Sequence, residues 1–225
     1  MGKRHSAQVR QALLFSSVLA TFLAGCATQA RSTAPHSAPA STNTTTSKGS
    51  EMATFAAGCF WSMEAIFKQL RGVEQVEPGY SGGTVPNPTY ELVETGTTGY
   101  AESINIAFDP KVISYHNLVQ ILLTVRDPTT LDKQGPDEGT QYRSVIFFRN
   151  EKQKQTTMRV INEITKSRIW QNPIITTVVP FAHFYRAEDY HLDYYNRHSD
   201  QPYCKYVIAP EIREFRAKFA SKLKE

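Results

Sequence analysis

The sequence predicts an α+β domain in which strands and helices follow one another without a strict βαβ rhythm. Short runs rich in β-branched and aromatic residues indicate the strands, and apolar residues spaced three or four positions apart indicate the helices. No internal repeat occurs. The 225 residues suffice for one globular domain of ordinary size, with additional residues at one end.

Between residues 52 and 125 the pattern predicts three strands, each followed by a helix. One helical face is marked by the apolar residues Met63, Ile66, Phe67 and Leu70, and Ser114 is a candidate N-cap. In the third strand, Ile104, Ile106 and Phe108 share one face. The expected elements are a strand over 52–58, a helix over 60–70, a strand over 73–83 that breaks into a glycine-rich loop, a short helix within 86–96, a strand over 101–108 and a helix over 114–125.

The second half begins with a polar loop over residues 126–141. A loop of about sixteen residues inside a compact domain is long and is often functional. A strand over 142–148, a long and mostly polar helix over 151–168 and a β-branched strand over 173–179 are expected next. A stretch rich in tyrosine and histidine follows, and the chain closes with a helix that starts near Pro210.

Charge and cysteine content exclude two classes of protein. The net charge is +4, and removing residues 1–25 takes away three of the 25 basic residues and none of the 21 acidic ones, which leaves +1. Nucleic-acid binding needs a basic face, so a nearly neutral body gives it no support. Three cysteines, Cys26, Cys59 and Cys204, are too few for a disulfide-stabilised scaffold.

Residues 1–25 are typical of a secretory signal peptide. A basic start precedes a short apolar run, residues 12–25, which is shorter than the roughly 20 residues that span a bilayer. The run ends in "LAGC", which resembles a bacterial lipobox and implies a lipid on Cys26. An ordinary signal peptide with an incidental cysteine is the alternative. Residues 26–50 are mostly Ala, Ser, Thr and Pro and predict a disordered tether, so the folded domain spans 51–225.

The stretch "AAGCFW" places Cys59 where a strand ends and a helix begins. A free cysteine there is commonly a small buried hydrophobic residue. Unsatisfied N–H groups at a helix N-terminus, however, stabilise a thiolate and lower the pKa of the thiol, which makes the sulfur nucleophilic. Two large aromatic residues, Phe60 and Trp61, follow, and a structural turn does not need both. Cys59 is therefore a candidate nucleophile.

Several blocks of this domain resemble the A-type peptide methionine sulfoxide reductases. The matching blocks occur in order as "GCFW" at 58–61, "PGYSGG" at 78–83, "NPTYELV" at 87–93, "TTGYAE" at 97–102, "FDPKVISY" at 108–115, "DPTTLDKQGPDEGTQYRS" at 127–144 and "AEDYHLDYY" at 187–195. Independent blocks in the right order are far more specific than one motif. The resemblance implies a two-layer sandwich with a mixed, mainly antiparallel sheet and a ferredoxin-like core.

The resemblance also implies a role for individual residues. Cys59 attacks the sulfoxide sulfur and keeps the oxygen as a sulfenic acid, while Glu102 protonates the departing oxygen. Tyr90 and Tyr142 hydrogen-bond that oxygen, and Asp137 helps to organise the pocket. On the strand pattern alone, Glu102 shares the apolar face of residues 101–108, and a strand-end acid that reaches solvent is the alternative.

Phe60 and Trp61 are implied to form the walls that receive the S-methyl group of the substrate. An aromatic box suits a methyl group on sulfur because sulfur–aromatic contacts are favourable. Two core aromatic residues on the first turn of a helix are the alternative. One residue departs from the family pattern: Tyr100 stands where a histidine is usual, in the block that precedes Glu102.

Cys204 lies near the position of the family's resolving cysteine, although its neighbours are bulky rather than glycines. A resolving role and a purely structural role both remain open. If Cys204 resolves the sulfenic acid, a thioredoxin-like partner would reduce the resulting disulfide. The signal peptide requires this reductant to act outside the cytoplasm. The resemblance implies no cofactor.

These features predict a lipid-anchored enzyme of the bacterial cell envelope that faces the periplasm, with the outer membrane favoured because no acidic residue follows Cys26 directly. The expected substrate is methionine S-sulfoxide in oxidised proteins, with the free amino acid as a further candidate. A thiol hydrolase with His191 as the base of Cys59, and a non-enzymatic envelope lipoprotein, are the alternatives. His183, His191 and His198 lie close in sequence, but their spacing matches no standard zinc site.

Overall fold

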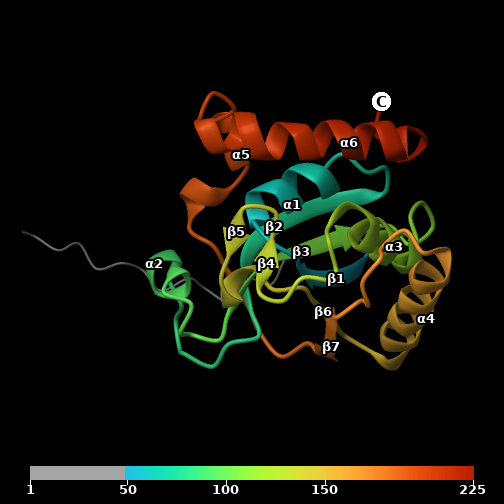
Figure 1. The fold of residues 1–225 in the computed structure, drawn as a ribbon, viewed down its shortest axis with the longest axis horizontal. Coiled ribbons are helices and arrows are strands. Elements are labelled where there is room, and N and C mark those ends of the chain that lie inside the picture. The colour runs from blue at the N-terminus through green and yellow to red at the C-terminus, as the bar shows by residue number, and fades with distance from the viewer. Residues whose placement is uncertain (1–48) are drawn as a thin grey trace, which may run out of the picture. The chain divides into compact units, whose positions relative to one another are not determined.

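The computed structural model describes residues 49–225, which belong to one compact unit of the chain (Figure 1). At its centre is a six-stranded sheet with the order β7-β6-β1-β3-β2-β8. Only β6 and β7 pair in parallel, so the sheet is mixed and mainly antiparallel, as predicted. The strands are β1 (Glu51–Ala56), β2 (Val73–Ser81), β3 (Ala101–Phe108), β6 (Val145–Phe148), β7 (Thr177–Pro180) and β8 (Phe184–Arg186).

Four of these strands and two helices form the expected ferredoxin-like core. The helices are α1 (Phe60–Phe67), between β1 and β2, and α3 (Tyr115–Val125), between β3 and β6. The chain order is therefore strand, helix, two strands, helix and strand, and the spatial order is β6-β1-β3-β2. A short helix, α2 (Tyr90–Glu94), lies in the long connection between β2 and β3.

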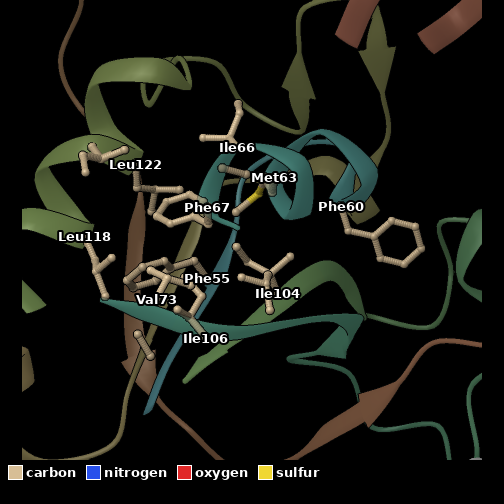
Figure 2. Packing of buried hydrophobic residues seen from close by; sticks show 14 of the residues in the cluster. Phe55, Phe60, Met63, Ile66, Phe67, Val73, Ile104, Ile106, Leu118 and Leu122 are labelled. Atoms are coloured by element: carbon tan, nitrogen blue, oxygen red, sulfur yellow. The ribbon is translucent and has the colours of Figure 1, made fainter. Parts of the chain in front are cut away.

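The main core lies between the sheet and helices α1 and α3. Phe55 of β1 and the alternating residues Ile104 and Ile106 of β3 point toward α1 and α3, where Phe67 and Leu118 meet them (Figure 2). All five side chains are fully buried. Phe60, on the first turn of α1, extends to the edge of this cluster (Figure 2). Packing therefore fixes the first turn of α1, and with it the position of Cys59, the residue that precedes this turn.

Capping residues define where three helices begin. Thr89, Ser114 and Asn150 accept hydrogen bonds from backbone N–H groups at the starts of α2, α3 and α4 (Glu151–Ser167), respectively. Helix α4 packs on α3 and connects β6 to its parallel neighbour β7. The last long helix, α6 (Ala209–Phe219), packs on α1, and Figure 1 shows it on the side of α1 that faces away from the sheet.

Several predicted boundaries were wrong. The strand expected over 173–179 is β7 at Thr177–Pro180, and β8 was missed because Phe184–Arg186 is too short to show a period. The loop over 126–141 contains a small hairpin, β4 (Lys133–Gln134) and β5 (Asp137–Glu138), and the strand expected from residue 142 begins at Val145.

The ends of two predicted helices also differ. Helix α1 stops at Phe67, and Leu70 instead pairs with Leu223 near the chain terminus. A five-residue π-helix, Cys204–Ile208, precedes α6, which ends at Phe219 rather than at the last residue. The short helix α5 (Tyr194–Arg197) lies in the Tyr/His-rich stretch. Side-chain periodicity does not distinguish a π turn from the α turns that follow it.

The predicted signal peptide over 1–25, Cys26 and the tether up to residue 48 lie outside the described residues. Within residues 49–225, no helix combines the length and apolar character that a bilayer crossing requires.

Candidate active site

Cys59 is the N-cap residue of α1 and lies at the end of the turn that leaves β1. Its carbonyl accepts the Met63 N–H at 3.2 Å. Gly58 makes this turn possible: its φ is +81°, and a Cβ there would lie 2.6 Å from the guanidinium of Arg126 and from the side chain of Gln134. The Gly58 N–H donates to the carbonyl of Tyr142 at 3.0 Å. The cysteine is therefore in the strand-to-helix position that its sequence predicted.

The pKa of the Cys59 thiol is raised well above its usual value, which corrects the expectation of a lowered pKa. The cysteine is only 5% exposed, and burial is the main cause. The negative charges of Glu102 and Asp137 act in the same direction, while the Ser62 N–H and the Tyr203 hydroxyl favour the thiolate without prevailing. In the substrate-free site the sulfur therefore keeps its proton.

Glu102 projects from β3 toward the start of α1 and is 2% exposed. Its Oε2 accepts the Phe60 N–H at 2.9 Å. Burial raises the pKa of this carboxyl well above its usual value, and the charges of Glu94 and Asp137 add to the rise, against the lowering by the Phe60 N–H. A carboxyl group with a raised pKa holds its proton to a higher pH than an exposed acid does, and it can deliver that proton to a neighbouring acceptor.

Two tyrosines contribute hydroxyl groups to the same place. Tyr90 is the first residue of α2, and Tyr142 closes a short 3₁₀ turn, Thr140–Tyr142. The Tyr142 hydroxyl donates to Glu94 Oε2 at 3.0 Å. Burial first, and then the charge of Glu102, raises the pKa of both phenols, so both remain hydrogen-bond donors at any physiological pH.

Asp137 lies on the small hairpin and accepts a hydrogen bond from the Tyr203 hydroxyl at 2.6 Å. Burial raises the pKa of Asp137, while Tyr203 and the charge of Arg126 lower it. The Tyr203 hydroxyl, whose one proton goes to Asp137, also lies beside the Cys59 sulfur, so one phenol stands between the acid and the thiol. Sequence reasoning missed Tyr203; its position directly before Cys204 was the only available signal.

Arg126 is a second residue that sequence reasoning missed. It is 2% exposed, and its guanidinium donates to the Ala57 carbonyl at 2.8 Å and to Ser62 Oγ at 3.2 Å. Glu211 of α6 pairs with it at 2.7 Å. This ion pair, in which the guanidinium is buried and the carboxylate is partly exposed, connects the turn that carries the cysteine to the C-terminal helix.

The aromatic residues after Cys59 form one side of the site. Phe60 is fully buried and lies 6.2 Å from the Trp61 ring and 6.3 Å from the Tyr90 ring, measured between centroids. Trp61 stacks on Tyr194 at 3.8 Å, and its indole N–H donates to His191 Nδ1 at 2.9 Å. The site therefore has an apolar aromatic wall that several elements hold in position.

His191 is completely buried, and burial lowers its pKa to about 4. The neutral ring accepts the Trp61 N–H and packs 4.5 Å from the Tyr90 ring, between centroids. Among the described residues, no hydrogen bond joins His191 to Cys59. The cysteine–histidine pair that a thiol hydrolase requires is therefore not formed.

Cys204 is fully buried in the core, where it begins the π-helix, and both described cysteines are free thiols. Burial raises its pKa, with a smaller contribution from Asp200. Tyr100 donates its hydroxyl to the Val85 carbonyl at 2.8 Å. Across residues 49–225, no group of three or more His, Cys, Asp or Glu residues is arranged to hold a metal ion, and this includes His183, His191 and His198.

Comparisons with known proteins match this chain to one family. The family model described as peptide methionine sulfoxide reductase matches residues 51–223. The peptide methionine sulfoxide reductase MsrA of Saccharolobus solfataricus is 49% identical over 174 residues, which cover 77% of this chain and 97% of the relative. The protein of the same name from Deinococcus radiodurans is 44% identical over 197 residues, covering 85% of this chain and 95% of the relative.

Solved structures agree with the sequence relatives. Reduced Mxr1 from Saccharomyces cerevisiae superposes with a TM-score of 0.65 and 32% identity, over 69% of this chain and 90% of that chain. Methionine sulfoxide reductase A of Corynebacterium diphtheriae superposes with a TM-score of 0.60 and 29% identity, over 68% of this chain and 76% of that chain. With the family model, the relatives and the fold in agreement, the chain belongs to the peptide methionine sulfoxide reductase family.

Proposed function

We propose that this protein reduces methionine S-sulfoxide to methionine, in oxidised proteins and as the free amino acid, with Cys59 as the nucleophile. The observation that carries the proposal is the meeting of a thiol, Cys59, and a buried carboxyl group, Glu102, at the first turn of α1. Family membership supports the same activity.

The chemistry balances without an external proton. The Cys59 sulfur forms a bond to the sulfoxide sulfur, and Glu102 gives its proton to the sulfoxide oxygen. The thiol proton of Cys59 replaces the one that Glu102 gave. The hydroxyl group then moves from the substrate sulfur to the Cys59 sulfur: the substrate S–O bond and the new S–S bond break, and a bond forms between that oxygen and the Cys59 sulfur. Methionine leaves as the thioether, and Cys59 becomes a sulfenic acid.

A raised thiol pKa is compatible with this sequence of steps. Thiol and sulfoxide become sulfenic acid and thioether with no net gain or loss of protons. Cys59 and Glu102 therefore both begin protonated, and the thiolate forms only when its proton has an acceptor nearby. Tyr90 and Tyr142 hydrogen-bond the sulfoxide oxygen in this proposal, and Asp137 with Tyr203 orients the substrate beside Cys59.

The aromatic wall selects the substrate. Phe60 and Trp61 enclose the S-methyl group, which is the part that all methionine sulfoxides share. A longer alkyl group on sulfur would meet the ring of Phe60, which is already fully buried. Ethionine sulfoxide should therefore be a poorer substrate than methionine sulfoxide.

In this proposal, Cys204 takes part in regenerating the Cys59 thiol. The Cys204 sulfur attacks the sulfenic acid, water leaves and a Cys59–Cys204 disulfide forms, which a dithiol protein of the thioredoxin type then reduces. Because Cys204 is buried, the π-helix that it begins must rearrange first. Peptide mapping after one turnover without reductant should find this disulfide; a persistent sulfenic acid beside a free Cys204 would assign Cys204 a structural role.

The N-terminal sequence extends the proposal to the cell envelope. Lipidation of Cys26 anchors the enzyme to a membrane facing the periplasm, preferably the outer one, so its thioredoxin-like reductant acts outside the cytoplasm. The test is metabolic labelling with a fatty acid in a bacterial host. The full chain should carry the label and sediment with membranes, and Cys26→Ser should do neither. An unlabelled wild-type chain would contradict the anchor.

The activity itself is tested with the two sulfoxide epimers. One turnover of the reduced chain should form about one equivalent of methionine from the S epimer and none from the R epimer, and Cys59→Ser should form none from either. Equal consumption of both epimers, or methionine formed by Cys59→Ser, would reject the proposal.

A further inference from the structure

Glu94 is a carboxylic acid in the site to which the sequence patterns assigned no role. It is the last residue of α2 and follows Tyr90 by four positions, so both side chains leave the same face of that helix. The Tyr142 hydroxyl donates to Glu94 Oε2 at 3.0 Å. Within the described part of the chain, the buried Oε1 of Glu94 and the buried Oε1 of Gln141 have no hydrogen-bond partner.

The carboxyl groups of Glu94 and Glu102 lie within hydrogen-bonding reach of each other. A carboxylate can only accept, so this contact requires a proton on one of the two groups. Two carboxyl groups that share a buried site do not both ionise, and the pair releases its protons in two widely separated steps. The contact therefore holds one proton in the middle of the active site.

The surrounding groups decide which carboxyl keeps that proton. Glu94 Oε2 receives the Tyr142 hydroxyl, which stabilises an ionised Glu94. Glu102 is the more deeply buried of the two and has one donor, the Phe60 N–H. The mutual hydrogen bond lowers the pKa of Glu94 and raises that of Glu102. The proton thus belongs on Glu102, with the Glu94 carboxylate beside it.

We propose that Glu94 is a positioning residue that keeps the proton of Glu102 in place until the sulfoxide oxygen accepts it. This inference rests on the proposed reductase function, and it adds a second carboxyl group to the acid. Glu94 does not touch the substrate; it acts through Glu102, and Tyr142 fixes its carboxylate.

Other titratable groups also face the pair, and none replaces Glu94. Asp137 is a further carboxyl group that acts on both members, and its charge disfavours ionisation of each. Its hydrogen bond, however, comes from Tyr203, so it acts on the pair at a distance. The remaining groups are the neutral thiol and phenols of Cys59, Tyr80, Tyr90 and Tyr142.

Replacing Glu94 by glutamine should move the pH dependence of the chemical step. Glutamine still accepts the Tyr142 hydroxyl but carries no charge, so Glu102 loses its proton at a lower pH. Because the step requires protonated Glu102, the alkaline fall in rate should shift toward acid by roughly one pH unit. At low pH, where Glu102 is protonated in either protein, the two rates should agree within about threefold.

The experiment is single-turnover formation of methionine from the S-sulfoxide by the full chain between pH 5 and 10. Glu91→Gln is the matched control because it removes the same charge from the exposed side of α2, and its profile should be unchanged. Glu94→Asp, which retains the charge, should shift less than Glu94→Gln. An unshifted alkaline limb in Glu94→Gln, or an equal loss of rate at every pH, would overturn the inference.

A readout that needs no turnover separates this inference from the function on which it rests. The carbonyl infrared band of a protonated carboxylic acid should persist at neutral pH in the wild-type chain and disappear in Glu102→Gln. In Glu94→Gln its pH midpoint should fall. If the band behaves in this way and no methionine forms, the proposed function is wrong and the inference about Glu94 and Glu102 holds. If the midpoint is unchanged in Glu94→Gln, the inference is wrong whatever the activity.

Discussion

At the scale of single residues, burial decides the protonation states of the site. Cys59 lies at a helix N-terminus, which favours a thiolate, yet its raised pKa shows that desolvation and two nearby carboxyl groups outweigh that effect. The same burial holds a proton on Glu102. In the proposed mechanism, the protonated Glu102 therefore has the proton for the departing oxygen already in place.

Replacing Glu102 by glutamine should slow methionine formation about a hundredfold or more, because an amide cannot protonate the oxygen. The raised pKa of Glu102 fixes the sign of the pH effect: wild-type activity is complete at low pH and falls as Glu102 ionises, whereas the residual activity of Glu102→Gln lacks this limb. Single-turnover rates across pH test this. A variant with the wild-type rate would mean that the proton comes from another group.

His191→Leu should raise KM about fivefold and leave the maximal rate of sulfenic acid formation within a few-fold. The substitution removes the acceptor of the Trp61 indole N–H, and a net hydrogen bond of about 1 kcal/mol fixes that ring. His191→Asn, which can still accept, is the control. A drop in kcat of a hundredfold or more in both variants would instead indicate a base and favour the hydrolase alternative.

The site was partly predictable at this scale. A cysteine between a strand and a helical pattern is visible in a sequence, and so is an acid on the apolar face of residues 101–108. The direction of the shift in the Cys59 pKa was not, because it depends first on burial and then on the charges of Glu102 and Asp137, and only the fold creates both. Glu94 and Tyr203 were missed for the same reason.

At the scale of elements, the short helix α2 has little stability of its own. It has five residues, begins with the cap Thr89 and carries both Tyr90 and Glu94. Thr89→Ala should remove about 1 kcal/mol of local capping energy and lower kcat/KM several-fold with little change in global Tm. Ser114→Ala removes the corresponding cap of α3. Ser114→Ala should lower global stability by about 1 kcal/mol without a loss of activity. A loss of global stability in Thr89→Ala, or a loss of activity in Ser114→Ala, would contradict this.

The ion pair of Arg126 and Glu211 joins the cysteine-bearing turn to α6. Glu211→Gln should destabilise the fold by about 2–3 kcal/mol, because it removes the ion-pair partner of the buried Arg126 guanidinium. Glu214→Gln, on the exposed side of the same helix, should change stability by less than about 0.5 kcal/mol. Urea unfolding of both variants measures the difference, and equal values would mean that the pair contributes nothing.

Helices and strands long enough to show a repeating hydrophobic pattern were predictable from the sequence, and shorter elements were not. The patterns at residues 60–70, 101–108 and 114–125 correspond to α1, β3 and α3. Strand β8, the hairpin of β4 and β5 and the π-helix were missed because each is a few residues long and is stabilised by partners distant in sequence.

At the scale of the whole molecule, folding buries Glu102 in a place where its ionised form is less stable than it is in the unfolded chain. Because the folded chain binds the Glu102 proton more tightly than the unfolded chain does, this stabilisation is complete below the usual pKa of 4.5 and is lost as the pH rises. Glu102→Gln keeps the acceptor for the Phe60 N–H and cannot ionise. It should be more stable than wild type by about 1 kcal/mol at pH 8 and equally stable near pH 4. Thermal unfolding at both pH values tests this; a variant less stable at pH 8 would contradict it.

The central claim is that oxygen passes from methionine S-sulfoxide to the Cys59 sulfur. The most direct measurement mixes reduced Cys204→Ser chain with the sulfoxide and traps sulfenic acid with dimedone, followed by peptide mass mapping. The account predicts one adduct on Cys59 for each methionine formed, and none without sulfoxide. Methionine formed without an adduct on Cys59 would contradict it.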